Sequence, residues 1–139
     1  MQIDELIENF TLFDDWEDRY RYIIELGKAL PTMDEALKTP DSKVEGCTSQ
    51  VWFVASPATD DNGKTVLHFI GDSDAHIVRG LIAILFAIHE GKSPDDIKTI
   101  DAEAHLKDLG LDQHLSPSRT NGLYAMLGRI RDMADRLSA

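Results

Sequence analysis

The chain has 139 residues, of which 42% are hydrophobic, and it carries 25 acidic against 14 basic side chains, for a formal net charge of -11. A chain of this length predicts a single domain, residues 1–139, that buries enough apolar surface to need no metal or disulfide for its stability. The negative charge repels phosphate backbones and anionic lipid surfaces, so we expect no nucleic-acid partner and no membrane-surface partner.

The amino-terminal part of the chain is predicted to form two helices. Apolar residues recur at helical spacing in the first of them, at Ile3, Leu6, Ile7 and Phe10. The second is expected from about Asp15 to Leu30, because acidic residues stand in its first turn, where they suit the helix dipole, and Pro31 follows its end.

The middle of the chain is predicted to form strands. Residues 51–55 and 66–70 are rich in β-forming side chains. The Asn62-Gly63 pair between them is typical of a tight hairpin turn with positive φ angles. Residues 43–45 are expected to add a short third strand, which leaves residues 46–49 as the connection between strands.

The rest of the chain is predicted to be helical. Apolar side chains between Ile77 and Ile88 make a stripe so wide that this helix is expected to be the central one, with Asp72 or Ser73 as its amino-terminal cap. Three further helices are expected to begin at or near Ser93, Ala102 and Ser116. The predicted fold class is therefore α+β, a small antiparallel sheet of about three strands flanked by helices.

No segment has the pattern of a membrane helix. The longest apolar segment, residues 81–88, is far shorter than the roughly 20 residues that a membrane helix needs. No basic region followed by an apolar stretch of the signal-peptide type stands at the amino terminus. We therefore expect a cytoplasmic protein without a membrane span.

Cys47 is the only cysteine of the chain, which excludes an internal disulfide, a Cys-x-x-Cys redox pair and a thiolate metal site built from this chain alone. It follows Gly46 and has polar neighbours, while the apolar strand begins only at Val51, so the thiol is expected on a loop. A buried apolar filler is the common role of such a cysteine, but its place on a loop favours a functional thiol.

A reactive thiol must ionise, and a nearby cation or helix amino terminus promotes this. Glu45 opposes it, and Arg119 is the best candidate for a cation, because a helix start is an unfavourable place for a positive charge. A solvent-exposed arginine without a role is an equally good interpretation. The five histidines show no metal-ligand spacing and the glycines form no phosphate loop, so we predict no metal and no cofactor.

Four segments together resemble the SufE family of sulfur acceptors. They are WEDRYRYIIELGKALP, VEGCTSQVW, GDSDAHIVRGLIA and HLSPSRTNGL, and the resemblance runs from about Phe10 to the end of the chain. Each segment alone is weak, but the four stand in the family's order and spacing. Glu45 departs from the glutamine expected in close relatives.

The resemblance implies a fold shared with the IscU-type scaffolds and an accessory, sulfurtransferase-like protein. Such a protein takes sulfane sulfur from a pyridoxal-phosphate cysteine desulfurase of the SufS or CsdA type, stimulates that enzyme and passes the sulfur to a scaffold of the SufB type. Cys47 matches the cysteine that carries the persulfide. The other matching residues are expected to shape the cysteine loop or contact the desulfurase; they are Arg119, Asp74, Gly46, Ser49, Gln50 and Trp52.

Two further hypotheses remain beside the persulfide carrier. The first is an acidic binding module that regulates a partner enzyme, in which Cys47 is incidental. The second, a scaffold for iron–sulfur clusters, is disfavoured because such clusters are generally held by several thiolates and this chain has one.

Overall fold

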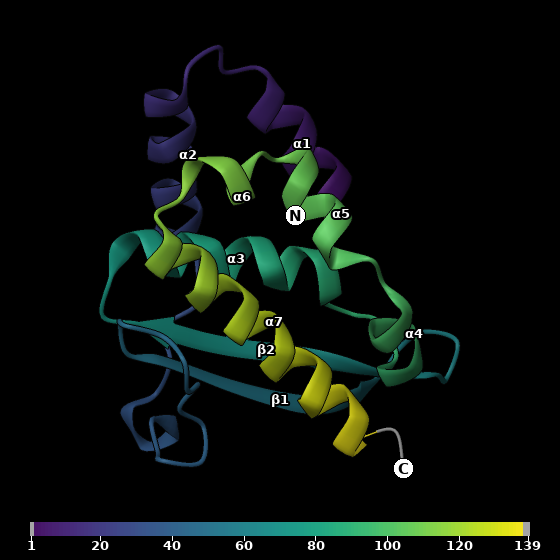
Figure 1. Cartoon of the computed structure of the whole chain (residues 1–139). Coiled ribbons are helices and arrows are strands. Elements are labelled where there is room, and N and C mark those ends of the chain that lie inside the picture. The colour runs from purple at the N-terminus through teal and green to yellow at the C-terminus, as the bar shows by residue number, and fades with distance from the viewer. Residues whose placement is uncertain (1, 138–139) are drawn as a thin grey trace.

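The computed structural model describes residues 2–137. The elements along the chain are α1 (Ile3–Thr11), α2 (Trp16–Lys28), the 3-10 turn η1 (Glu35–Leu37), β1 (Val51–Thr59), β2 (Thr65–Ser73), α3 (His76–His89), α4 (Pro94–Thr99), α5 (Ala102–Asp108), α6 (Leu111–His114) and α7 (Pro117–Leu137). Figure 1 shows α3 and α7 against the β1–β2 hairpin, with α1 and α2 packed on the far side of α3. The predicted α+β class is confirmed.

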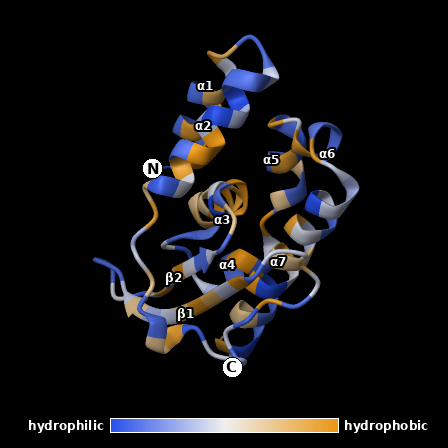
Figure 2. Ribbon diagram, turned by 90° about the vertical axis from the view of Figure 1, so that its left-hand side faces the viewer, coloured by the Kyte–Doolittle hydropathy of each residue, from blue (hydrophilic) through white to orange (hydrophobic). Residues whose placement is uncertain are grey.

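Helix α3 is the centre of the molecule, as its wide apolar stripe predicted. Ten of its 14 residues are buried, and Figure 2 shows it as a hydrophobic rod enclosed by the other elements. Helix α2 crosses it in backbone contact, since a Cβ built on Gly80 would lie 2.1 Å from the carbonyl oxygen of Ile23. Glycine is therefore required where α2 and α3 cross.

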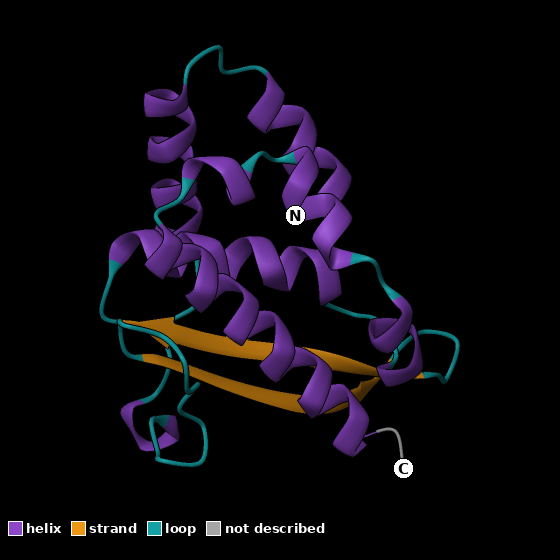
Figure 3. Ribbon diagram, viewed as in Figure 1, coloured by secondary structure: helices purple, strands orange, loops and turns teal. Residues whose placement is uncertain are grey.

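The sheet of the described residues has two strands, so the expectation of about three is corrected (Figure 3). Strands β1 and β2 pair antiparallel from Val51 opposite Ser73 to Thr59 opposite Thr65. Residues 43–45 do not form a third strand, because Lys43 makes only an isolated bridge to Trp52. The chain then turns away from β1 at Gly46, whose φ is +89°. The segment therefore runs beside β1 for too few residues to form a β-ladder with it.

The two turns that flank β2 differ in detail from expectation. In the hairpin, Gly63 has a positive φ of 78°, but Asn62 does not, and the Asp60 carboxylate accepts from the amides of Asn62 and Lys64 instead. At the other end, β2 continues through Ser73, so neither expected residue caps α3. The residue before the helix is Ala75, and it makes no side-chain cap.

Two short elements, η1 and α6, were not expected from the sequence, whereas α7 begins as predicted. The Ser116 hydroxyl accepts from the Arg119 amide, which satisfies one of the free donors at the helix start. None of the helices in the described part of the chain is both long and apolar enough to cross a membrane.

Candidate functional site

The cysteine loop, defined here as residues 45–49, connects the bridge at Lys43 to strand β1 and lies along α7. Gly46 is needed in this loop for two reasons. Its φ of +89° is strained for other residues, and a Cβ at this position would lie 3.1 Å from the Cβ of Ala125 on α7. The backbone of the loop at Gly46 therefore lies so close to α7 that a larger side chain would crowd Ala125.

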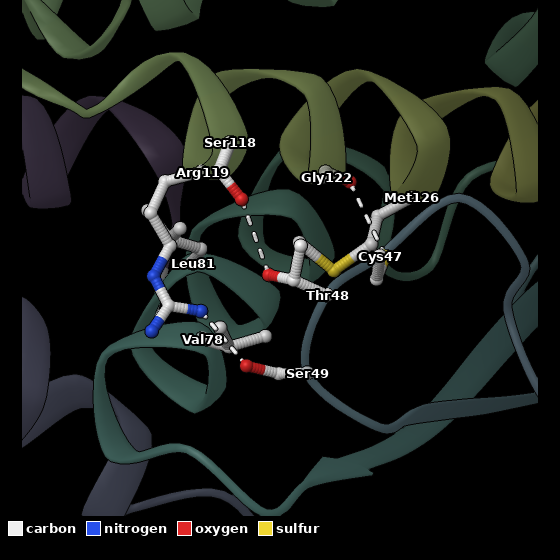
Figure 4. Close-up of a pocket in the computed structure, with 9 residues that line it drawn as sticks. All are labelled: Cys47, Thr48, Ser49, Val78, Leu81, Ser118, Arg119, Gly122 and Met126. Carbon is white, nitrogen blue, oxygen red and sulfur yellow. Dashed lines mark hydrogen bonds between the residues drawn. The ribbon is translucent and has the colours of Figure 1, made fainter.

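The Cys47 thiol is half-buried and points at α7 (Figure 4). Its Sγ donates to the carbonyl oxygen of Gly122 over 3.6 Å. It borders a cavity of about 10 Å³, which is close to the room that one water molecule needs. The cavity is lined by Cys47, Thr48, Ser49, Val78, Leu81, Ser118, Arg119, Gly122 and Met126.

Two further side-chain contacts hold the loop to the first turn of α7. The Arg119 guanidinium donates through Nη1 to the Ser49 hydroxyl over 2.9 Å, and the Ser118 hydroxyl donates to the Thr48 hydroxyl over 3.3 Å. Both pairs join residues that stand 70 positions apart in the chain. The loop is thus closed over the thiol by few bonds, each between partly or fully exposed groups.

The base of the loop is an extension of the hairpin. The Gln50 amide donates to the Asp74 carboxylate over 3.1 Å, and the Asp74 amide donates to the Gln50 carbonyl over 3.3 Å. This pair is next in register after Val51 and Ser73. Asp74 thereby fixes the point at which the chain leaves the sheet.

Trp52 lies apart from the cavity. Its neighbours Val51 and Phe53 are buried in the core, so its own side chain points to the opposite face of the sheet. There the Lys38 ammonium lies 5.1 Å from the centre of the indole ring and pairs with the Asp72 carboxylate at 2.9 Å. These contacts tie η1 to the sheet next to the loop base.

The electrostatics of the site favour a protonated thiol. Burial is the main cause that raises the pKa of Cys47, and the Glu45 carboxylate raises it further. The Arg119 guanidinium also lies in the cavity wall, where it donates to the Ser49 hydroxyl and not to the thiol. A protonated thiol also supplies the hydrogen that the bond to Gly122 requires.

Of the predicted residues, the structure gathers Cys47, Ser49 and Arg119 at the cavity and places Gly46 next to Cys47, against Ala125 of α7. It joins Gln50 to Asp74 at the loop base and leaves Trp52 on the other side of the sheet. Sequence reasoning missed the remaining cavity residues, Thr48, Ser118, Gly122, Met126, Val78 and Leu81. The spacing of Ser118, Gly122 and Met126 places them on one face of the last helix, and this pattern was a usable signal. Among residues 2–137, no three His, Cys, Asp or Glu side chains gather as a metal site.

Comparison with known proteins decides the family. Residues 4–134 match the family model for SufE, described as an Fe-S metabolism associated domain. The chain belongs to the SufE family. An uncharacterized SufE-like protein of Rhizobium etli is 50% identical over 132 residues, which are 95% of this chain and 88% of that protein. A second one, of Rhizobium meliloti, is 51% identical over 133 residues, covering 96% and 94% of the two chains.

A solved structure supports the fold of this SufE family member. The solution structure of a hypothetical protein from Thermus thermophilus matches with a TM-score of 0.71, covering 99% of this chain and 96% of that one. The two share 21% sequence identity, so this likeness concerns the fold alone. The family model adds the association with Fe–S metabolism.

Proposed function

We propose that this protein accepts persulfide sulfur on Cys47 from a pyridoxal-phosphate cysteine desulfurase of the SufS or CsdA type, stimulates that enzyme, and passes the sulfur on for iron–sulfur cluster assembly. The setting is the cytoplasm and the receiver a SufB-like scaffold. The family assignment supports the general role. The observation that carries the proposal is the cavity beside the Cys47 thiol.

The size of this cavity suits the cargo. Its volume of about 10 Å³ leaves room for roughly one small atom group next to Sγ. Its floor is apolar, formed by Val78, Leu81 and Met126. One added sulfur atom would be shielded there from water and oxidants, whereas a bulkier adduct would not fit.

The transfer step is a displacement at sulfur. The Cys47 thiolate attacks the terminal sulfur of the donor's cysteine persulfide, the donor S–S bond breaks, and the donor cysteine leaves as a thiolate. The new S–S bond on Cys47 holds the transferred sulfur, so no external oxidant or reductant is consumed. Passing the sulfur on to an acceptor thiolate repeats the same chemistry.

The resting site disfavours this reaction, because the half-buried thiol has a raised pKa and, while protonated, is a poor nucleophile. Cys47 must therefore leave the cavity before it can ionise, and the few bonds to Ser118, Arg119 and Gly122 permit this. Gly46 and Ser49 shape the closed loop in this proposal, and Gln50 and Asp74 hold its base. Asp74, which is exposed, and Trp52, on the outer face of the sheet, are proposed contacts with the partner.

The test is the intact mass of the protein after incubation with a cysteine desulfurase and free cysteine. Wild type is expected to gain one sulfur atom that a reductant removes, and Cys47→Ser is expected to gain none while keeping its fold. If wild type binds the desulfurase but gains no sulfur, the protein acts as a binding module and the thiol is incidental.

A further inference from the structure

Helix α7 contacts the chain well beyond the cysteine loop. The pairs run in opposite directions along the two segments: Arg119 meets Ser49, Gly122 meets Cys47, Ala125 lies under Gly46, and Arg129 reaches the backbone of residues 41–43. Positions 119, 122, 125 or 126 and 129 share one face of a helix. Residues 41–49 contact this face of α7 along their length.

The upstream part of that segment, residues 41–44, is called the stem here. Arg129 donates through Nη1 to the Lys43 carbonyl over 3.3 Å and through Nη2 to the Asp41 carbonyl. On its other side the stem bonds to β1, because the Val44 amide donates to the Val51 carbonyl over 2.8 Å and the Phe53 amide donates to the Ser42 carbonyl over 2.9 Å. The stem is thus held between a strand and a helix.

The cysteine loop is held differently. Its bonds to α7 are three side-chain contacts of 2.9, 3.3 and 3.6 Å. In the stem, Ser42 and Val44 are buried, at 7% and 3% exposure, and alternate with the exposed Asp41 and Lys43. In the loop no residue is fully buried, and Glu45, Gly46 and Thr48 are open to solvent. Opening is therefore easiest between Val44 and Gln50, and the stem stays in place.

We propose that Arg129 is a positioning residue for Cys47, because it fixes the stem and so confines loop opening to residues 45–49. That Arg129 positions Cys47 for sulfur transfer rests on the proposed function, whereas its fixing of the stem does not. Cys47 stands three residues from each anchor, Val44 and Gln50. Three extended residues span about 10 Å. The fixed stem therefore limits how far Cys47 can extend from the protein surface. The donor sulfur must lie within about 10 Å of the partner surface that contacts the loop base.

No sequence pattern pointed to Arg129, and its contacts do not touch the thiol. A guanidinium suits the task, because its planar fork can donate to two carbonyl oxygens at once. Lysine has one ammonium group and can hold one carbonyl well, so Arg129→Lys is expected to restore part of the effect that Arg129→Gln removes. Arg131→Gln is the matched control, since Arg131 stands on the same helix but pairs with Glu103 of α5.

The first experiment uses the free protein and needs no sulfur transfer. Hydrogen exchange at the Val44 amide is expected to be about tenfold faster in Arg129→Gln, the factor for losing roughly one hydrogen bond to a charged donor. Exchange at the Leu85 amide in α3 reports global unfolding and serves as the reference. Arg131→Gln should leave the ratio of the two rates unchanged. An unchanged ratio in Arg129→Gln would overturn the proposal.

The second experiment measures persulfide formation at Cys47 against the concentration of this protein, with desulfurase and cysteine present. A badly presented thiol lowers the maximal rate severalfold and leaves the KM for this protein unchanged, with partial rescue by Arg129→Lys. A rise in KM alone would mean that Arg129 contacts the partner directly, which contradicts a positioning role. If even wild type takes up no sulfur, the proposed function fails, and the exchange at Val44 still decides whether Arg129 holds the stem.

Discussion

Gly80→Ala tests the packing that positions the floor of the thiol cavity. Gly80 lies between Val78 and Leu81, which both line the cavity, and faces α2. The added Cβ would lie 2.1 Å from the Ile23 carbonyl oxygen, about 0.9 Å short of the 3.0 Å that Cβ atoms keep. Because this neighbour is backbone, the helices have to separate. Overpacking costs about 3 kcal/mol, and the better helix propensity of alanine offsets about 1 kcal/mol of it.

The expected net loss in the free energy of unfolding is therefore about 2 kcal/mol, which urea titration would measure. Gly128→Ala is the matched control, since Gly128 also lies inside a helix but a Cβ there meets nothing within 4 Å. This control is expected to be more stable than wild type by up to about 1 kcal/mol. Alkylation of Cys47 by iodoacetamide should be faster in Gly80→Ala than in Gly128→Ala, because the cavity floor moves. A Gly80→Ala protein as stable as wild type would refute the reasoning.

Two pH-dependent predictions follow from buried or half-buried groups. His89 is fully buried, with Nδ1 bonded to the Leu85 carbonyl and Nε2 without a partner, and burial lowers its pKa below the usual 6.5. The unfolded chain then binds a proton that the folded protein refuses, so stability is full above about pH 6.5 and falls as the pH drops below it. Urea unfolding of wild type should give a lower free energy of unfolding at about pH 5.5 than at about pH 7.5, and this difference should be lost in His89→Gln. An equal pH dependence in the two proteins would contradict this. For the thiol, Glu45→Gln removes the second cause of the raised pKa, so the pH profile of Cys47 alkylation should shift to lower pH, while burial still keeps the midpoint above that of an unburied thiol. An unshifted profile would mean that the Glu45 charge does not act on the thiol.

The sequence predicted the longer helices well because each of them is set by a local period, whereas the four residues of α6 are too few to show one. The central position of α3 followed from its wide apolar stripe, and the beginning of α7 followed from the Ser116-Pro117 signal. The hairpin was predicted from β-forming runs on either side of a turn. Where a prediction depended on how far a segment pairs, it failed: residues 43–45 make one bridge and not a strand, since the positive φ at Gly46 bends the chain away.

The sequence by itself determined that one thiol stands on a polar loop, and its motifs indicated the family. Only the tertiary structure decided what surrounds that thiol. The partners of the loop lie about 70 residues further along, on α7. They are the Ser118 hydroxyl, the Arg119 guanidinium and the Gly122 carbonyl, none of which gives a hydrophobic signal. The loop is held against α7 by one guanidinium, one hydroxyl and one carbonyl. The raised pKa of Cys47 has the same origin, because desolvation depends on atoms that no local pattern brings together.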